Sequence, residues 1–191
     1  MARFNPLFLL GLLLATAACE RPAPPTSAKA ETSYNLTAYL QEQKQRLQAE
    51  RPMVLKSVQT GDQPTETIET DAVNWEDELA VFEEADLNRP ALQEYYTKQE
   101  QALEDGSTAI TYHRREDAEP MVQHLQLILG PDQKLKQLDA LLQDKNWLFY
   151  TRRNIQLLAD PATGNLSGYN VQGVQKLIFG DSLHYKVDAN L

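Results

Sequence analysis

An alternation of apolar and polar residues with a period of two restricts the fold of this sequence more than any other feature, and it runs from Thr108 almost to the end of the chain. Successive side chains of a β-strand point to opposite faces of a sheet, so this pattern predicts strands with one buried and one exposed face. Clusters of Gly, Pro, Asp and Asn separate the alternating runs, as the turns of hairpins do. The predicted strands are 108–115, 122–129, 135–142, 147–158, 167–179 and 183–187. Their regular spacing favours an antiparallel meander, although the run 135–142 also fits a helical stripe.

A helical pattern opens the part of the chain before this region. Ser33 or Asn35 can cap a helix that runs to about Ala49, and Pro52 stops it because proline cannot continue a helix. The apolar stripe of this helix consists of Leu36, Tyr39, Leu40 and Leu47. This side is expected to pack against the strands.

A hairpin and further helical segments follow. The segments 53–60 and 65–71 are rich in Val, Thr and Ile and predict two paired strands. A second helix is expected over 75–85, with a further helical turn or two at 91–96. The buried side of the helix at 75–85 comprises Trp75, Leu79 and Phe82, and Trp75 is expected to anchor this helix to the sheet. Its carboxylates are expected to face water, namely Glu76, Asp77, Glu83 and Glu84. The predicted fold class is α+β, with N-terminal helices packed on a curved antiparallel β-meander.

The first predicted hairpin of the meander allows a register to be derived. If its turn centres on residues 117–120, Ile110 lies opposite Leu127 and Tyr112 lies opposite Leu125, which builds a consistent apolar face. The same register places His113 directly opposite His124. Two facing imidazoles can supply two ligands to zinc or copper, but the pairing places no third ligand, so two surface histidines and no metal site are predicted.

The first 19 residues have the features of a bacterial lipoprotein leader. One positive charge, Arg3, precedes a short apolar stretch, and small residues then lead to Cys19. The apolar stretch spans about 14 Å as a helix, too little to cross a hydrocarbon core of about 30 Å. We therefore expect a signal peptide at 1–18, a lipidated Cys19, and attachment to the membrane through acyl chains such as palmitate. Glu20, rather than Asp, after the cysteine favours the outer membrane, with the protein facing the periplasm.

A Pro-rich tether, 19–33, is expected to separate this lipid anchor from a single domain at 34–191. The segment holds no apolar side chain larger than proline, and its prolines favour an extended polyproline conformation. The net charge of -9 argues against a nucleic-acid partner, whose binding would require a basic surface. It also argues against electrostatic binding to anionic headgroups, so the lipid is expected to hold the protein at the membrane.

The sequence shows no motif that indicates catalysis or a cofactor. It has no nucleophile elbow, phosphate-binding loop, His-Glu-x-x-His pattern or calcium loop, and its single cysteine excludes a disulfide framework. The aromatic residues of the meander are expected to fill the core or, alternatively, to line a pocket for an apolar ligand. They are Trp147, Phe149, Tyr150, Tyr169, Phe179 and Tyr185.

Three segments give the chain a resemblance to a known group of proteins. They are the helix pattern Trp75-Glu76-Asp77-Glu78-Leu79 with Phe82, the exit Asp86-Leu87-Asn88-Arg89-Pro90, and Asn146-Trp147-Leu148-Phe149-Tyr150. Together with the leader they resemble uncharacterised short lipoproteins of Bacteroidota, with the pattern W-x-x-E-L-x-x-F … D-I-N-K-P. Leu87 replaces Ile and Arg89 replaces Lys here, and Phe149 is inserted before Tyr150. The resemblance implies the same location and the order of helices before sheet, and it implies no activity.

The exit of the second helix is a candidate interaction site. Asp86, Asn88 and Arg89 can form a corner that binds a protein partner, or they can simply shape a turn. The sequence therefore predicts a non-catalytic, lipid-anchored envelope module with an interaction or maintenance role. A carrier of an apolar small molecule is the alternative, and a hydrolase is a third possibility.

Overall fold

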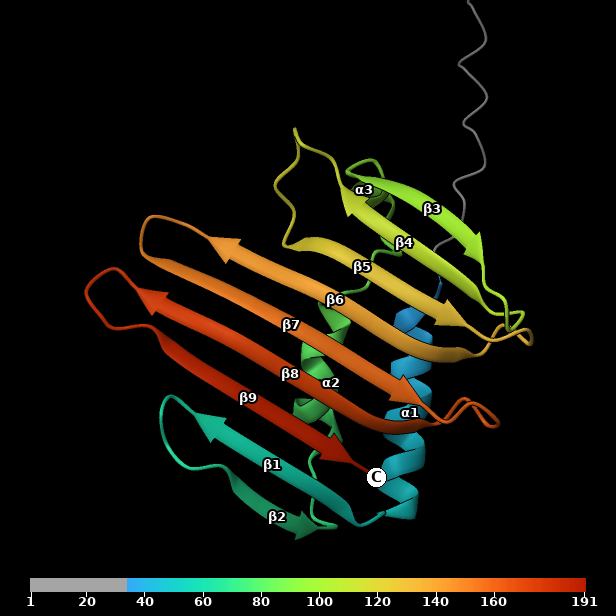
Figure 1. The fold of residues 1–191 in the computed structure, drawn as a ribbon, viewed down its shortest axis with the longest axis horizontal. Helices are drawn as coiled ribbons and strands as arrows, with labels where there is room; N and C mark the ends of the chain where they lie inside the picture. Colours follow the sequence, from blue (N-terminus) through green and yellow to red (C-terminus); the bar gives the residue numbers. More distant parts are fainter. Residues whose placement is uncertain (1–33) are drawn as a thin grey trace, which may run out of the picture. The chain divides into compact units, whose positions relative to one another are not determined.

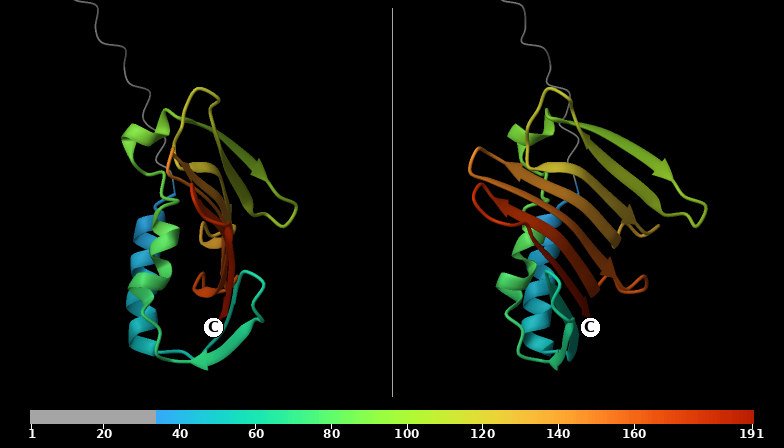
Figure 2. Two further views of the ribbon diagram at one scale, coloured as in Figure 1. Left: turned by 90° about the vertical axis from the view of Figure 1, so that its left-hand side faces the viewer. Right: turned by 60° about the vertical axis from the view of Figure 1, so that its left-hand side comes forward.

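The computed structural model describes residues 34–191, which all belong to one compact unit. Within this part of the chain, nine antiparallel strands form a single open sheet, and helices α1 and α2 lie against one of its faces (Figure 1; Figure 2). The predictions of a signal peptide, a lipidated Cys19 and a Pro-rich tether lie outside the described residues. None of the helices described here is long and apolar enough to cross a membrane.

The elements follow one another in an order that mixes helices with strands. They are α1 (Leu36–Glu50), β1 (Val54–Thr60), β2 (Glu66–Thr70), α2 (Trp75–Glu83), α3 (Pro90–Gln93), β3 (Tyr96–Ala102), β4 (Thr108–Arg114), β5 (Val122–Leu129), β6 (Leu135–Lys145), β7 (Phe149–Ala159), β8 (Leu166–Leu177) and β9 (Leu183–Asn190). The expected class, α+β with an antiparallel sheet, is confirmed. The helices are not all N-terminal, however, since α2 and α3 follow the first hairpin.

The strand order is β2-β1-β9-β8-β7-β6-β5-β4-β3. Strands β4 to β9 form the predicted meander, in which each strand pairs with the next, and β3 extends it at the edge beside β4. The hairpin of β1 and β2 then joins the meander at its far edge, where β1 pairs with β9. The run 135–142 is a strand and not a helix, because β6 pairs with a neighbour along each of its edges.

Strand β3 is absent from the sequence prediction. Its residues, Tyr-Thr-Lys-Gln-Glu-Gln-Ala, show no apolar alternation, and among them only Tyr96 is buried. All seven of its residues pair with β4, and this main-chain pairing holds the strand without an alternating apolar face. Tyr96 holds the strand to the body through its hydroxyl, which donates to the backbone oxygen of Val122 at 2.8 Å.

The register predicted for β4 and β5 is confirmed. Ile110 pairs with Leu127, Tyr112 with Leu125, and His113 with His124. The apolar members of these pairs are buried beneath the helices, as the alternation requires.

Helix α1 begins where Asn35 caps it, its side chain accepting a hydrogen bond from the backbone N–H of Ala38. The predicted stripe is buried, and Leu40 and Leu47 are fully enclosed. Gln43 and Lys44 are buried on the same helix although they are polar. Gln43 accepts a hydrogen bond from the backbone N–H of Leu166 on β8, which ties the helix to the sheet.

Helix α2 buries Trp75, Leu79 and Phe82, as predicted. Of the carboxylates predicted to face water, Glu76 and Asp77 are exposed, whereas Glu83 and Glu84 are half-buried. Glu76 and Glu83 each accept a hydrogen bond from the buried Lys44 ammonium at 2.6 Å. Two further residues of this segment form ion pairs with strands, Glu78 with Lys56 and Glu84 with Arg153. The acidic run therefore binds cations of α1, β1 and β7, because its helix lies between them.

The aromatic residues of the meander have different environments. Tyr169 is buried against Phe82 in an edge-to-face contact, with ring centroids 5.8 Å apart. Trp147 and Phe179 are 79% and 95% exposed, so the prediction that they fill the core is wrong. They lie outside the strands, because β7 begins only at Phe149 and β8 ends at Leu177.

Candidate functional site

The face of the sheet opposite α1 and α2 is covered by no described element, and we call it the open face (Figure 2). It carries the side chains that alternate with the buried ones along each strand. Over β5 to β8 amides are the most frequent of these, and they lie beside one imidazole and one carboxylate. This polar group includes His124, Gln126, Gln137, Asp139, Asn154, Gln156, Asn170 and Gln172. The same face also carries four aliphatic side chains, Ile128, Leu141, Leu158 and Val174, and, toward one end, Lys145, Tyr150, Arg152 and Lys176. The middle of the open face therefore offers many groups that both donate and accept hydrogen bonds.

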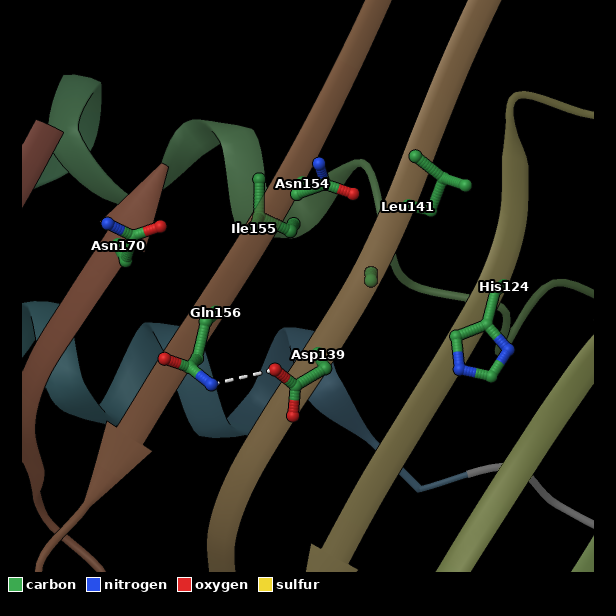
Figure 3. Close-up of a pocket in the computed structure, with 8 residues that line it drawn as sticks. His124, Asp139, Leu141, Asn154, Ile155, Gln156 and Asn170 are labelled. Carbon is green, nitrogen blue, oxygen red and sulfur yellow. Dashed lines mark hydrogen bonds between the residues drawn. The ribbon is translucent and has the colours of Figure 1, made fainter. Parts of the chain in front are cut away.

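A hollow of about 250 Å3 lies near the middle of the open face (Figure 3). Its lining comes from four neighbouring strands and consists of His124, Asp139, Ala140, Leu141, Asn154, Ile155, Gln156 and Asn170. Its labelled side chains are largely polar (Figure 3). Ala140, Leu141 and Ile155 contribute apolar surface, so the lining offers hydrogen-bonding groups beside apolar ones.

Asp139 is at the centre of the hydrogen bonds in this hollow. Gln156 donates its side-chain N–H to one carboxylate oxygen at 2.8 Å (Figure 3). Gln137 donates to the other oxygen at 2.5 Å. At the edge of the hollow, Asn170 donates to Asp188 at 2.5 Å. These bonds orient the amides of Gln137, Gln156 and Asn170, whose side-chain oxygens accept no hydrogen bond within residues 34–191.

The two histidines of the predicted pair lie together on the open face. Their Nδ1 atoms are 3.3 Å apart and their ring centroids 4.8 Å apart. Burial lowers the pKa of His124, the neighbouring His113 lowers it further, and Asp139 opposes both, with a net decrease. Among residues 34–191 no group of three or more His, Cys, Asp and Glu could hold a metal ion.

We expect His124 to titrate below its ordinary pKa of 6.5 in an NMR titration of ring signals. Replacing His113 with Ala should raise the pKa of His124, because the neighbouring positive charge is removed. Since the folded state resists protonation of His124 more than the unfolded state does, this group's contribution to stability is full above pH 6.5 and is lost as the pH falls. A His124 signal that stays in place after the His113→Ala change would contradict the coupling.

The corner formed by Asp86, Asn88 and Arg89 divides into an internal and an exposed part. Asp86 is buried, and its carboxylate accepts the Thr37 hydroxyl at 2.8 Å and the backbone N–H of Asn88 at 3.0 Å. Asn88 is half-buried and Arg89 is exposed. Asp86 thus joins α1 to the exit of α2, while Asn88 and Arg89 can reach a partner.

Replacing Asp86 with Ala should lower the free energy of unfolding by about 1–3 kcal/mol, because two donors lose their acceptor in a largely buried place. Urea denaturation followed by circular dichroism measures the change. The double change Asn88→Ala, Arg89→Ala should leave stability nearly unaltered, so a loss of a pull-down partner in that variant would report binding. If the double variant and the unaltered protein captured the same partners in the pull-down, this result would count against the corner as an interaction site.

The space between helices and sheet is occupied by the hydrophobic core. Phe82, Leu40, Leu47, Leu138 and Leu157 are fully enclosed there. This packing lends no support to an apolar-ligand pocket between the helices and the sheet.

The polar residues of the hollow, apart from His124, are absent from the sequence prediction. A hairpin register could have found them, because Asp139 pairs with Gln156 across β6 and β7. The predicted strands 135–142 and 147–158 leave the turn between 142 and 147, however, which is too early, since β6 continues to Lys145 and that residue pairs with Tyr150. The error in the turn shifts every cross-strand neighbour along this hairpin.

No protein-family model, curated protein or solved structure matches this chain.

Proposed function

We propose that this protein is a non-catalytic, lipid-anchored module of the bacterial cell envelope that binds a glycan chain across its open face. The observation that carries the proposal is the hollow of four strands lined by His124, Asp139, Asn154, Gln156 and Asn170. Amide side chains offer a donor and an acceptor side by side, and the hydroxyls of a sugar accept and donate in the same way. An open, shallow surface suits a chain that extends beyond the hollow on both sides.

A binding role is favoured over catalysis by the way the ionisable groups are held. Asp139 already accepts two amide hydrogen bonds, and His124 lies against a second imidazole. Catalysis by two carboxylates needs a pair in different, partly dry environments on either side of the reacting bond. The lining of this hollow offers one carboxylate.

The lipid anchor is the second part of the proposal, and it depends on the leader sequence that ends at Cys19. Acylation there would attach the module to the outer membrane on its periplasmic side, beside the cell wall. Intact mass spectrometry of protein from its own host, with palmitate labelling, tests this. A mature chain that begins elsewhere, or an unmodified Cys19, would exclude the anchor and leave the glycan proposal standing.

Cosedimentation of the full chain with purified cell-wall glycan tests the binding. The double change Gln156→Ala, Asn170→Ala should weaken binding by about two- to tenfold for each lost hydrogen bond. A matched control is Gln99→Ala, Gln101→Ala, which removes two exposed amides on the edge strand β3, away from the hollow. Equal loss in both variants, or no sedimentation of the unaltered protein, would overturn the proposal.

A carrier of an apolar small molecule is the alternative that the sequence raised. Native mass spectrometry of protein purified from its host tests this alternative, because a retained apolar ligand would add a defined mass. Such a mass would replace the glycan proposal.

A further inference from the structure

Two neighbouring turns at one end of the sheet expose large apolar side chains, and we call this set the apolar tips. The set consists of Trp147, Leu148, Leu177, Ile178, Phe179 and Leu183. Trp147 and Leu148 lie in the β6–β7 turn, Ile178 and Phe179 lie in the β8–β9 connection, and Leu177 and Leu183 are the last residue of β8 and the first residue of β9. The two turns lie at the same end of the sheet (Figure 1). A backbone hydrogen bond from Ile178 to Leu148, 3.0 Å long, holds the two turns together.

The exposure of the apolar tips is large for a protein surface. Phe179 is 95% exposed and Trp147 is 79% exposed, and the other four side chains are 44–55% exposed. Single exposed apolar residues are common, but contiguous ones on a monomer mark an interaction site. Trp147, Leu148, Leu177 and Ile178 line a shallow hollow of about 150 Å3 together with Lys145, Tyr150 and Lys176. Phe179 and Leu183 are not part of that lining.

The backbone of the tips is largely satisfied by hydrogen bonds of its own. The side chain of Asn146 accepts from the N–H groups of Leu148 and Phe149 at 2.8 and 3.0 Å. The N–H of Gly180 donates to Leu177, and the N–H of Asn146 donates to Phe149. This arrangement lowers the cost of placing the turns in hydrocarbon, where an unsatisfied backbone group is expensive.

A row of cationic and aromatic side chains lies directly behind the tips on the open face. Tyr150 pairs with Lys145 on one side and with Lys176 on the other, so the three side chains are neighbours across β6, β7 and β8. Arg152, next along β7 on the same face, is exposed as well. Within residues 34–191 no carboxylate forms an ion pair with Lys145, Arg152 or Lys176. Exposed carboxylates also lie at this end of the sheet, namely Asp144 on the helix-covered side of β6, Asp181 in the β8–β9 connection, Asp62 and Glu66 in the β1–β2 hairpin, and Glu116, Asp117 and Glu119 between β4 and β5.

We propose that the apolar tips insert into a phospholipid surface, with Lys145, Tyr150 and Lys176 at the level of the headgroups. The order of side chains from the tip inward matches the order of layers in a bilayer. Phe, Ile and Leu suit the hydrocarbon, Trp and Tyr suit the interface, and Lys binds lipid phosphates. This charge complementarity favours a bilayer over a protein partner, and it is local, since the chain as a whole carries a net charge of -9.

This contact is separate from the N-terminal lipid and from the glycan hollow. Tyr34, where the described chain begins, lines a hollow with Gln133 and Thr163, which belong to turns at the other end of the strands. The apolar tips are thus a second membrane contact that does not require acylation of Cys19.

The two tryptophans make a direct test possible with the full chain. Trp147 is 79% exposed and Trp75 is 2% exposed, so Trp75 is an internal reference within the core. The protein is mixed with vesicles of phosphatidylethanolamine and phosphatidylglycerol that carry brominated acyl chains, which quench nearby indoles. We expect a blue shift of the Trp147 emission and its quenching. The Trp147→Phe variant, whose remaining tryptophan is Trp75, should show neither.

Variants of the tips separate insertion from anchoring. Phe179→Ser and Ile178→Ser should each reduce the quenching of Trp147 and weaken partitioning by about tenfold, equivalent to about 1.4 kcal/mol. Phe179→Trp should keep the partitioning. The matched control is Ile68→Ser, which removes a 56%-exposed apolar side chain from β2. Reading the quenching of Trp147 instead of total binding makes the result independent of the state of Cys19.

Unquenched Trp147 in vesicle-bound protein would overturn the proposal. A photocrosslinker at position 147 that captured a protein in cells and no lipid would overturn it as well. Equal losses in Ile68→Ser and Phe179→Ser would also contradict it, because the effect would then not belong to the tips.

Discussion

Replacing Phe82 with Ala is expected to lower the free energy of unfolding by about 3–5 kcal/mol, because a fully enclosed ring is removed from the core. Phe82 packs edge-to-face on Tyr169, so the change also removes the main aromatic contact between α2 and β8. In a domain of this size such a loss should lower the melting temperature by about 10 °C. Urea denaturation followed by circular dichroism gives the free energy.

Two further substitutions test whether this loss comes from the core packing of α2. Phe82→Leu keeps an apolar side chain in the site and should cost clearly less than Phe82→Ala. Val81→Ala, at the adjacent and only half-buried position, should cost less still. If the free energy of unfolding of Phe82→Ala lay within about 1 kcal/mol of that of the unaltered protein, α2 would not be packed on the sheet as described.

Replacing Lys44 with Ala is expected to lower the free energy of unfolding by about 2–3 kcal/mol. The Lys44 side chain is 3% exposed, and its ammonium donates to Glu76 and Glu83 at 2.6 Å each. Removal of one partner from a buried pair costs about 3–5 kcal/mol when the other stays buried. The cost here is smaller, since Glu76 and Glu83 are 58% and 38% exposed and water can solvate them.

Lys44→Met separates the charge from the buried stem of the side chain. Methionine keeps most of the apolar volume, so this variant should lose less than Lys44→Ala does. Glu76→Gln should change stability by less than about 1 kcal/mol, because that carboxylate is exposed. An equal loss in the Met and Ala variants would show that the packing of the stem contributes nothing.

Lys44 should also make the stability of the protein depend on pH in the alkaline range. Burial lowers the pKa of Lys44, but the hydrogen bonds to Glu76 and Glu83 outweigh it, and the net pKa lies above its ordinary value of 10.5. A raised pKa in the folded state means that the charge contributes fully below pH 10.5 and that this contribution is lost as the pH rises further. The stability difference between the unaltered protein and Lys44→Met should therefore shrink above pH 10.5.

The strands were predicted best where the apolar alternation of two neighbouring strands and the turn between them indicated the same register. The pairing of Ile110 with Leu127 follows from a clear alternation on both strands and from a recognisable turn between them. Strand β3 has no such alternation, because an edge strand with polar side chains is held by its neighbour and not by a buried face. Strand β3 therefore forms because it pairs with β4, and its own sequence carries no signal that predicts it.

Residue type alone could not assign the environments of the aromatic and charged residues. Trp147 and Phe179 have the composition of core residues, yet they follow the ends of strands and protrude. Lys44 is a cation on an apolar helical stripe, and its burial depends on carboxylates that lie 32 and 39 residues away in the sequence. The side chains that meet in the hollow depend likewise on the position of the β6–β7 turn. The sequence prediction ended β6 too early and therefore misplaced this turn.

The pairing of β1 with β9 determines when the molecule can complete its fold. Leu55 pairs with Asn190 and Thr60 with Tyr185, so one of the earliest strands needs the last one as its neighbour. Contacts between such distant segments form slowly, because a long loop must close before they stabilise anything. During synthesis the hairpin of β1 and β2 has no sheet to join until β9 has emerged. The nascent chain therefore cannot complete its sheet until its final strand is made.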